Sequence, residues 1–199
     1  MSASPFVLPS APETLEVTRE RVRLRPFEEH DLEAMAAYRG DAEVCRFLPF
    51  EPQTPDDIRD RNGQLMGATS LEGESGGVML VIERIEDGAV IGDLVLFHLD
   101  AAAGSAEIGW VVHPAASGRG LATEAVRALI DTAFDVYGLR RLVAQIDADN
   151  VRSAALAERL GMRREAHFVE NGWFKGRWSD LLVYAVLERE WRAAAPTAS

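Results

Sequence analysis

A glycine-rich loop directly before a helix constrains this chain more than any other feature of its sequence. The loop follows an apolar segment, 106–112, and leads into a stretch with apolar residues at helical spacing. The loop and the first helical turn comprise Ser117, Gly118, Arg119, Gly120, Leu121, Ala122 and Thr123. Glycines let a backbone approach a bulky anion, and the first turn of a helix offers unpaired N–H groups. The sequence therefore predicts a strand, a loop and a helix that can bind a pyrophosphate.

Three alternative interpretations apply to this loop. The first is a glycine-rich turn that binds no ligand. The second is a dinucleotide-binding fingerprint, which would need glycine or alanine where Thr123 stands and would turn directly from its strand, whereas residues 113–117 intervene here. The third, a Walker phosphate loop, is excluded because no Gly-Lys-Ser/Thr sequence follows.

Predicted strands and helices alternate on both sides of the loop. Apolar alternation and β-branched runs predict strands at 22–25, 78–85, 90–99, 106–112, 139–146, 167–169 and 181–187. Helices are predicted at 28–38, from Pro55 with Thr54 as its N-cap, from Leu121 to Thr132 and at 150–160. This order predicts one α/β (α+β mixed) domain over 19–192, with a mixed, mostly antiparallel central sheet and helices on both faces. Residues 1–18 are expected to form a flexible arm and 193–199 a disordered tail.

Composition and charge narrow the range of functions. With 47% hydrophobic and 27% charged residues, the 199-residue chain has the composition of a soluble globular protein. Its formal net charge of −11 disfavours nucleic-acid binding and favours a cationic acceptor. A single cysteine, Cys45, excludes an internal disulfide, so we expect a cytoplasmic setting. No apolar run is long enough to span a membrane, and the four histidines lack metal-ligand spacing, so neither membrane nor metal is expected.

Two motifs in a fixed order resemble the GNAT superfamily of acetyltransferases. The segments 106–114 and 118–125 resemble its motif A, Gln/Arg-x-x-Gly-x-Gly/Ala. Gly120 and Ala122 stand at the last two fixed positions of that motif, and Ser117 stands where Gln or Arg is usual.

The second motif lies further along the chain. Asn150 and Ser153, followed by Gly161 and Met162, resemble motif B, Asn-x-x-Ser…Gly-Phe, with Met162 in place of Phe. Asn150 is also expected to cap the helix at 150–160. The whole set, over 19–192, is similar to the branch that includes the N-terminal acetyltransferases of ribosomal proteins.

The resemblance implies acetyl-CoA as co-substrate and assigns residues to it. Two central strands are expected to separate, so that backbone groups of Trp110, Val111 and Val112 pair with pantetheine amides or face the thioester oxygen. The loop and first helical turn, from Ser117 to Thr123, would hold the pyrophosphate. Asn150 would contact the pantetheine arm, and Ser153 would lie near the thioester sulfur.

The resemblance also suggests catalytic residues. Glu107 is the candidate base, acting through water, because a carboxylate near an apolar cleft has a raised pKa that suits proton abstraction. The alternative for Glu107 is a solvent-facing strand residue, and Glu170 is a reserve base. Residues 156–159 contain no tyrosine to protonate the thiolate, so Ser153 or a water would serve. Phe47, Phe50, Trp173 and Phe174 lie in segments expected to be loops and would wall the acceptor region.

The expected reaction is acetylation of a primary amine by direct attack in a ternary complex. The acceptor is either a protein N-terminal α-amine or a small-molecule amine. A non-catalytic acyl-CoA-binding or sensor module and a transferase for another acyl-CoA are the alternatives. The resemblance is compatible with a homodimer.

Overall fold

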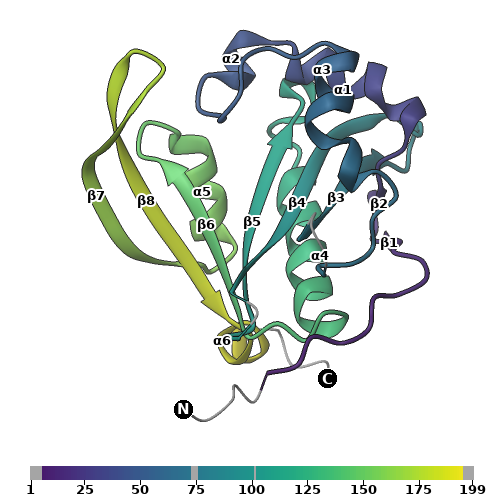
Figure 1. Cartoon of the computed structure of the whole chain (residues 1–199), viewed down its shortest axis with the longest axis vertical. Helices are drawn as coiled ribbons and strands as arrows, with labels where there is room; N and C mark the ends of the chain where they lie inside the picture. Colours follow the sequence, from purple (N-terminus) through teal and green to yellow (C-terminus); the bar gives the residue numbers. More distant parts are fainter. Residues whose placement is uncertain (1–5, 73–75, 101, 195–199) are drawn as a thin grey trace.

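One mixed sheet runs through the residues that the computed structural model describes, 6–72, 76–100 and 102–194. Its strands lie in the order β1-β2-β3-β4-β5-β6-β8-β7. They are β1 Val17–Thr18, β2 Val22–Pro26, β3 Gly77–Arg84, β4 Val90–Asp100, β5 Ser105–Val112, β6 Arg141–Asp147, β7 Arg163–Phe174 and β8 Arg177–Leu187. The helices are α1 Leu32–Arg39, α2 Ala42–Cys45, α3 Pro55–Asn62, α4 Leu121–Asp135, α5 Val151–Arg159 and α6 Glu188–Ala194. Among these strands only β5 and β6 pair in parallel, which confirms the expected mixed sheet (Figure 1).

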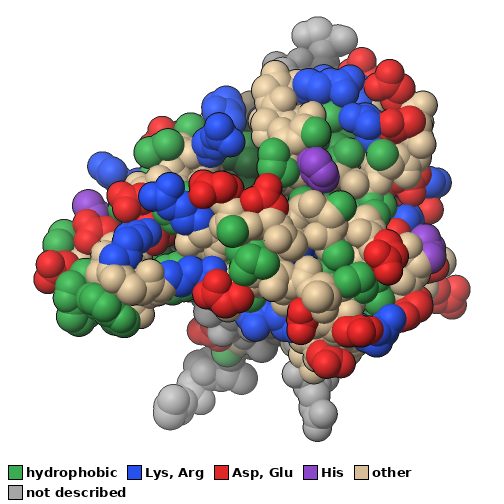
Figure 2. All heavy atoms as spheres, turned by 90° about the horizontal axis from the view of Figure 1, so that it is seen from above, with side chains coloured by type: hydrophobic (Ala, Val, Ile, Leu, Met, Phe, Trp, Pro, Cys, Tyr) green, Lys and Arg blue, Asp and Glu red, His purple; other side chains and the backbone are tan. Residues whose placement is uncertain are grey.

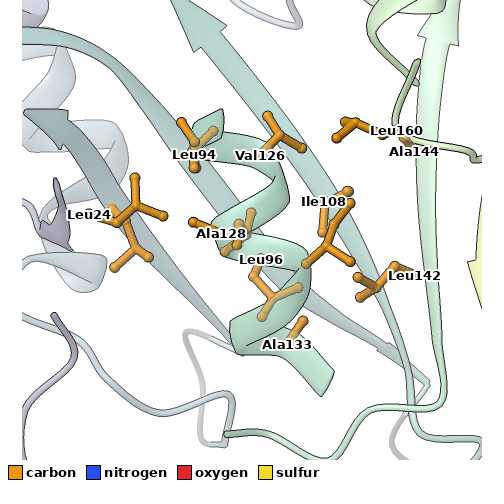
Figure 3. Close-up of a cluster of buried hydrophobic side chains, with 14 of the residues drawn as sticks. Leu24, Leu94, Leu96, Ile108, Val126, Ala128, Ala133, Leu142, Ala144 and Leu160 are labelled. Atoms are coloured by element: carbon orange, nitrogen blue, oxygen red, sulfur yellow. The ribbon is translucent and has the colours of Figure 1, made fainter. Parts of the chain in front are cut away.

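Helix α4 covers one face of the sheet with an apolar stripe. Val126 and Ala128 of the helix lie among Leu94 of β4 and Ile108 of β5 (Figure 3). The residues predicted for this stripe are all buried: Leu121, Ala125, Ala128, Leu129 and Thr132. Burial of Leu121 fixes the start of α4, and therefore the end of the glycine-rich loop, against the sheet.

The other face is covered by α1 and α3 around a second apolar cluster that includes Val111 of β5. A charged pair is buried there, because Arg39 and Asp93 are 2% and 1% exposed. Two guanidinium nitrogens of Arg39 donate to the Asp93 carboxylate at 2.6 and 2.9 Å, and the Tyr38 hydroxyl donates to it at 2.8 Å. Burial and this carboxylate raise the pKa of Tyr38, so the phenol stays neutral and remains a donor.

Strands β5 and β6 pair only where they begin. Their register runs from Ser105 opposite Arg141 to Glu107 opposite Val143 and then ends. Beyond this point the two strands diverge (Figure 1). The edge of β5 from Ile108 to Val112 therefore has no partner strand among the described residues. This opening between β5 and β6 is the separation that the sequence analysis expected.

Two helix starts agree with the sequence prediction in atomic detail. The Thr54 side chain accepts from the Asp57 N–H at 3.2 Å at the start of α3. The Asn150 side chain accepts from the Ser153 N–H at 3.2 Å at the start of α5. These bonds confirm both predicted caps. Each cap depends only on residues close in sequence, so the sequence alone could predict it.

The chain termini and two helices differ from the prediction. Residues 6–18 are not a loose arm, because Leu15 is 5% exposed and β1 pairs with β2. The Pro12 carbonyl oxygen also accepts from the Thr69 hydroxyl at 2.8 Å. Helix α6 extends to Ala194, into the expected tail, and the short α2 was not predicted. The parts of the arm and tail at 1–5 and 195–199 lie outside the described residues.

The last two strands also differ, since both are longer than predicted. β7 and β8 form a hairpin that projects from the sheet, with Lys175 and Gly176 at its turn (Figure 1). The φ angles of these two residues are 45° and 81°, the left-handed values of a type I′ turn. Trp173 and Phe174 therefore belong to a strand and not to a loop.

Glu165 of β7 contributes to the stability of this hairpin in a way that depends on pH. Hydrogen bonds from Arg141 and Arg163 lower its pKa from 4.5 to about 2. A depressed folded-state pKa stabilises the protein above the unfolded value, and that stabilisation is lost as pH falls from about 4.5 towards 2. We expect Glu165→Gln to lower the unfolding free energy by about 1 kcal/mol at pH 7 and by much less at pH 3. Urea unfolding at both pH values checks this, with the exposed Glu33→Gln as control; an equal loss at both would contradict it.

Candidate functional site

The glycine-rich loop adopts a conformation that only glycine takes without strain. Gly118 and Gly120 both have φ of 78°, and Gly120 is the N-cap of α4. The loop is exposed from Ser117 to Gly120. Because the first N–H groups of a helix have no partner within it, Leu121, Ala122 and Thr123 present donors at this end. The arrangement suits a phosphate group.

Arginines surround the loop and neutralise the acid in the first turn of α4. Arg21 donates to the Glu124 carboxylate from its backbone N–H and its side chain, both at 2.7 Å, and to the Arg119 carbonyl oxygen at 2.9 Å. A hollow beside the loop is lined by Glu20, Arg21, Arg84, Ile85, Glu86, Arg119 and Leu121. Arg21 thus holds the loop to β2 and keeps the Glu124 charge from facing a bound anion unpaired.

The free edge of β5 points alternate backbone groups into the opening. The His113 N–H donates to the Ile91 carbonyl oxygen at 2.8 Å, so odd-numbered residues bond towards β4. The backbone of Val111 therefore belongs to the β4 ladder. The backbone groups of Ile108, Trp110 and Val112 face the opening. Two of the three predicted backbone contacts, at Trp110 and Val112, are thus available to a ligand that adds as a strand.

Trp110 spans the opening on the face that carries α4 and α5. Its indole N–H donates to the Ser153 hydroxyl at 3.2 Å, and Ser153 is held by the Asn150 cap. Trp110 and Val112 are half-buried against the cluster that contains α4. Three predicted cofactor residues from β5 and α5 are therefore close together.

Glu107 lies on the opposite face, at the base of the opening. Along β5 it alternates with Ile108 and shares its face with Val111, which packs under α1. The Gln145 amide on β6 donates to its carboxylate at 2.8 Å. Gln145 was not among the site residues predicted from the sequence. Gln145 lies two residues after Val143 on β6, and Val143 is opposite Glu107 on β5. Because side chains two residues apart on a strand share a face, this register places Gln145 and Glu107 on the same face of the sheet.

The hairpin divides the predicted acceptor residues between two faces. Phe174, opposite Arg177, lies on the Glu107 face, and the Arg177 guanidinium carbon is 5.9 Å from the Phe47 ring centroid. Lys175 donates to the Phe50 carbonyl oxygen at 2.6 Å. The structure therefore places Phe47 and the Phe50 backbone beside Arg177 and Lys175, which follow Phe174 at the hairpin turn.

Trp173 does not join them. It is opposite Trp178, and the two rings are edge to face with centroids 5.5 Å apart. Trp178 shares its β8 face with Leu182 and Tyr184, which are buried on the α5 side. Trp173 is therefore on the face opposite Glu107, and it is 65% exposed. In the view from above, the left side of the molecule projects outward and carries a group of hydrophobic side chains at its end (Figure 2). Consecutive residues of a strand point to opposite faces, so Trp173 and Phe174 are separated. A loop prediction does not contain this alternation.

Glu170, the reserve base, is in an irregular part of β7. Its φ is 49°, and its N–H donates to the Asp180 carboxylate at 2.8 Å. Asp180 is on the Trp178 face of β8, so this backbone contact ties Glu170 to the side away from Glu107. Among the described residues no group of three His, Cys, Asp or Glu side chains is arranged to hold a metal ion. Within the same residues no helix is long and apolar enough to cross a membrane.

The sequence matches a family model and named relatives. The model for the acetyltransferase (GNAT) domain matches residues 21–163. The uncharacterized N-acetyltransferase YnaD of Bacillus subtilis is 30% identical over 89% of this chain and 99% of its own length. The putative ribosomal N-acetyltransferase YdaF of the same species is 34% identical over 53% of this chain and 57% of its own. The spermidine N(1)-acetyltransferase of Escherichia coli is 22% identical over 88% and 91%.

A solved structure agrees with these matches. The GNAT-family acetyltransferase from Bacillus anthracis superposes with a TM-score of 0.78 at 30% identity, covering 88% of this chain and all of that one. The predicted fold and family resemblance are therefore confirmed. This chain belongs to the GNAT family and is an acetyl-CoA-dependent N-acetyltransferase.

Proposed function

We propose that this protein transfers the acetyl group of acetyl-CoA to a primary amine by direct attack in a ternary complex. The separation of β5 and β6 beyond Glu107 carries this proposal. It leaves a free backbone edge on one side and an acidic group at the base of the opening on the other. The edge leads towards the loop and helix start at Gly120, where phosphates bind.

The two faces of the opening divide the chemistry. The loop and α4 start hold the pyrophosphate, and Trp110 and Val112 align the pantetheine arm. The amine enters on the Glu107 face. Glu107 takes its proton through water, and the nitrogen attacks the thioester carbon. A C–N bond forms and the C–S bond breaks, with the electron pair leaving on sulfur. The nitrogen then gives its second proton to water, which leaves a neutral amide.

The departing thiolate then takes a proton. The Ser153 hydroxyl, oriented by Trp110, or a water supplies its proton. The Gln145 amide holds the Glu107 carboxylate in place for the next cycle.

Two acceptor classes remain candidates. One relative is named a spermidine N(1)-acetyltransferase and another a putative ribosomal N-acetyltransferase. The net charge of −11 favours a cationic amine during encounter. A screen that follows release of free CoA with spermidine, other amines and an N-terminal peptide tests the proposal. Turnover of at least one amine supports it, whereas acetyl-CoA binding without CoA release on any amine would favour the sensor alternative.

Replacement of Glu107 tests the proposed base. We expect Glu107→Gln to lower turnover about tenfold or more while acetyl-CoA affinity stays near normal, because the amide cannot take a proton. Steady-state CoA release and a binding titration measure the two quantities, with Glu33→Gln as control. Unchanged turnover would remove Glu107 from this role.

A further inference from the structure

The tip of the β7–β8 hairpin is joined to the segment 45–51 by one lysine. The Lys175 ammonium donates to the carbonyl oxygens of Phe50 at 2.6 Å and Cys45 at 2.8 Å. It is also 3.5 Å from a carboxylate oxygen of Glu51. The two carbonyl groups are 125 and 130 residues from Lys175 in sequence. We call this contact the Lys175 bridge.

The contacts at this position suit a lysine side chain better than an arginine side chain. Lys175 is the only lysine among the 21 Lys and Arg residues of the chain. An ammonium is compact and carries three donors, which match two carbonyl oxygens and a carboxylate. A guanidinium is a planar fork and matches this set poorly. The type I′ turn places Lys175 at the hairpin tip despite its φ of 45°, which a non-glycine residue rarely adopts.

The Lys175 bridge spans the open ends of β5 and β6 on the Glu107 face. On the β5 side, Phe50 packs on the cluster that contains Val111. On the β6 side, Arg177 donates to the Asp147 carboxylate at 2.6 Å, where β6 ends. Figure 1 shows the α2 segment and the hairpin approaching each other above these strands. The acceptor side is therefore bounded by the Glu107–Gln145 pair below and by the bridge above.

We propose that Lys175 is a specificity-determining residue, whose bridge restricts the acceptor to a small, unbranched amine. This inference rests on the proposed function of the same site. A flexible amine chain needs only a narrow passage to reach Glu107. A protein N-terminus brings side chains and a folded body that the closed bridge excludes.

A labelling experiment tests the bridge without turnover. The Arg189→Lys variant adds a second lysine on exposed α6, so one reaction compares both. With an N-hydroxysuccinimide ester at neutral pH, peptide mass spectrometry should show Lys175 modified about tenfold more slowly than the introduced lysine, because its ammonium must first leave its partners. Equal rates would overturn the bridge.

A kinetic experiment tests specificity. Lys175→Met keeps an unbranched side chain and removes the ammonium. We expect the ratio of kcat/KM for spermidine over that for an N-terminal peptide to fall about tenfold, with acetyl-CoA affinity unchanged. Arg189→Met is the matched control and should keep the ratio. An unchanged ratio in folded Lys175→Met overturns the inference. A wild-type protein that acetylates no amine refutes the proposed function instead, and the labelling result still reports on the bridge.

Discussion

Gly120→Asp should weaken acetyl-CoA binding about 100-fold or more, beyond the range of a standard titration. The new carboxylate would stand at the N-cap of α4, where the proposed pyrophosphate must approach the helix. The protein should still fold, because a Cβ at Gly120 would meet only a terminal nitrogen of Arg21, at 3.6 Å. That arginine can pair with the introduced acid.

The φ of 78° at Gly120 is strained for aspartate, so the effect of this strain needs a separate control. Gly161 has a φ of 77° and open space around its Cβ position. It lies just after the C-terminal end of α5, whereas Gly120 lies at the N-terminal end of α4. Gly161→Asp should therefore have a similar backbone strain and bind acetyl-CoA normally. Calorimetric titration of both variants separates strain from the phosphate contact. Normal binding by Gly120→Asp would place the pyrophosphate elsewhere.

Asp93→Asn should destabilise the protein by about 3 kcal/mol, because it leaves the Arg39 charge buried without a counter-ion. Arg39 also contacts the proposed acceptor wall, since its guanidinium carbon is 4.9 Å from the Phe50 ring centroid. Urea unfolding monitored by tryptophan fluorescence measures the loss.

The double variant Arg39→Met/Asp93→Asn provides the test of cause. It removes both charges and keeps an acceptor for the Tyr38 hydroxyl, so we expect it to recover more than half of the lost stability. A loss below about 1 kcal/mol in the single variant, or no recovery in the double one, would contradict this role for the pair.

Local signals predicted the loop and the helix starts that form the proposed cofactor side of the site. The stripe on α4, the Asn150 cap and the loop glycines depend on residues within one or two helical turns, where spacing is informative. The order of strands around the loop then fixed the mixed sheet. The backbone of Val111 was predicted to face the cofactor, but it bonds to β4. The sequence does not show which backbone groups of β5 pair with that strand.

The acceptor side depends on contacts between distant segments. Lys175 and segment 45–51 meet across more than half of the chain, and Gln145 reaches Glu107 only because β5 and β6 begin as a pair. The aromatic residues beside a Lys-Gly turn resembled a loop, so the face of Trp173 could not be assigned. Tertiary pairing, not local propensity, decides these positions.

Calorimetric titration of the purified protein with acetyl-CoA, with NAD as control, tests whether the loop at Gly120 and the free edge of β5 form the cofactor site. We expect micromolar binding of acetyl-CoA and none of NAD, because the loop and the strand edge together match a phosphate group joined to an amide chain. Folded protein that fails to bind acetyl-CoA would contradict the assignment of this site.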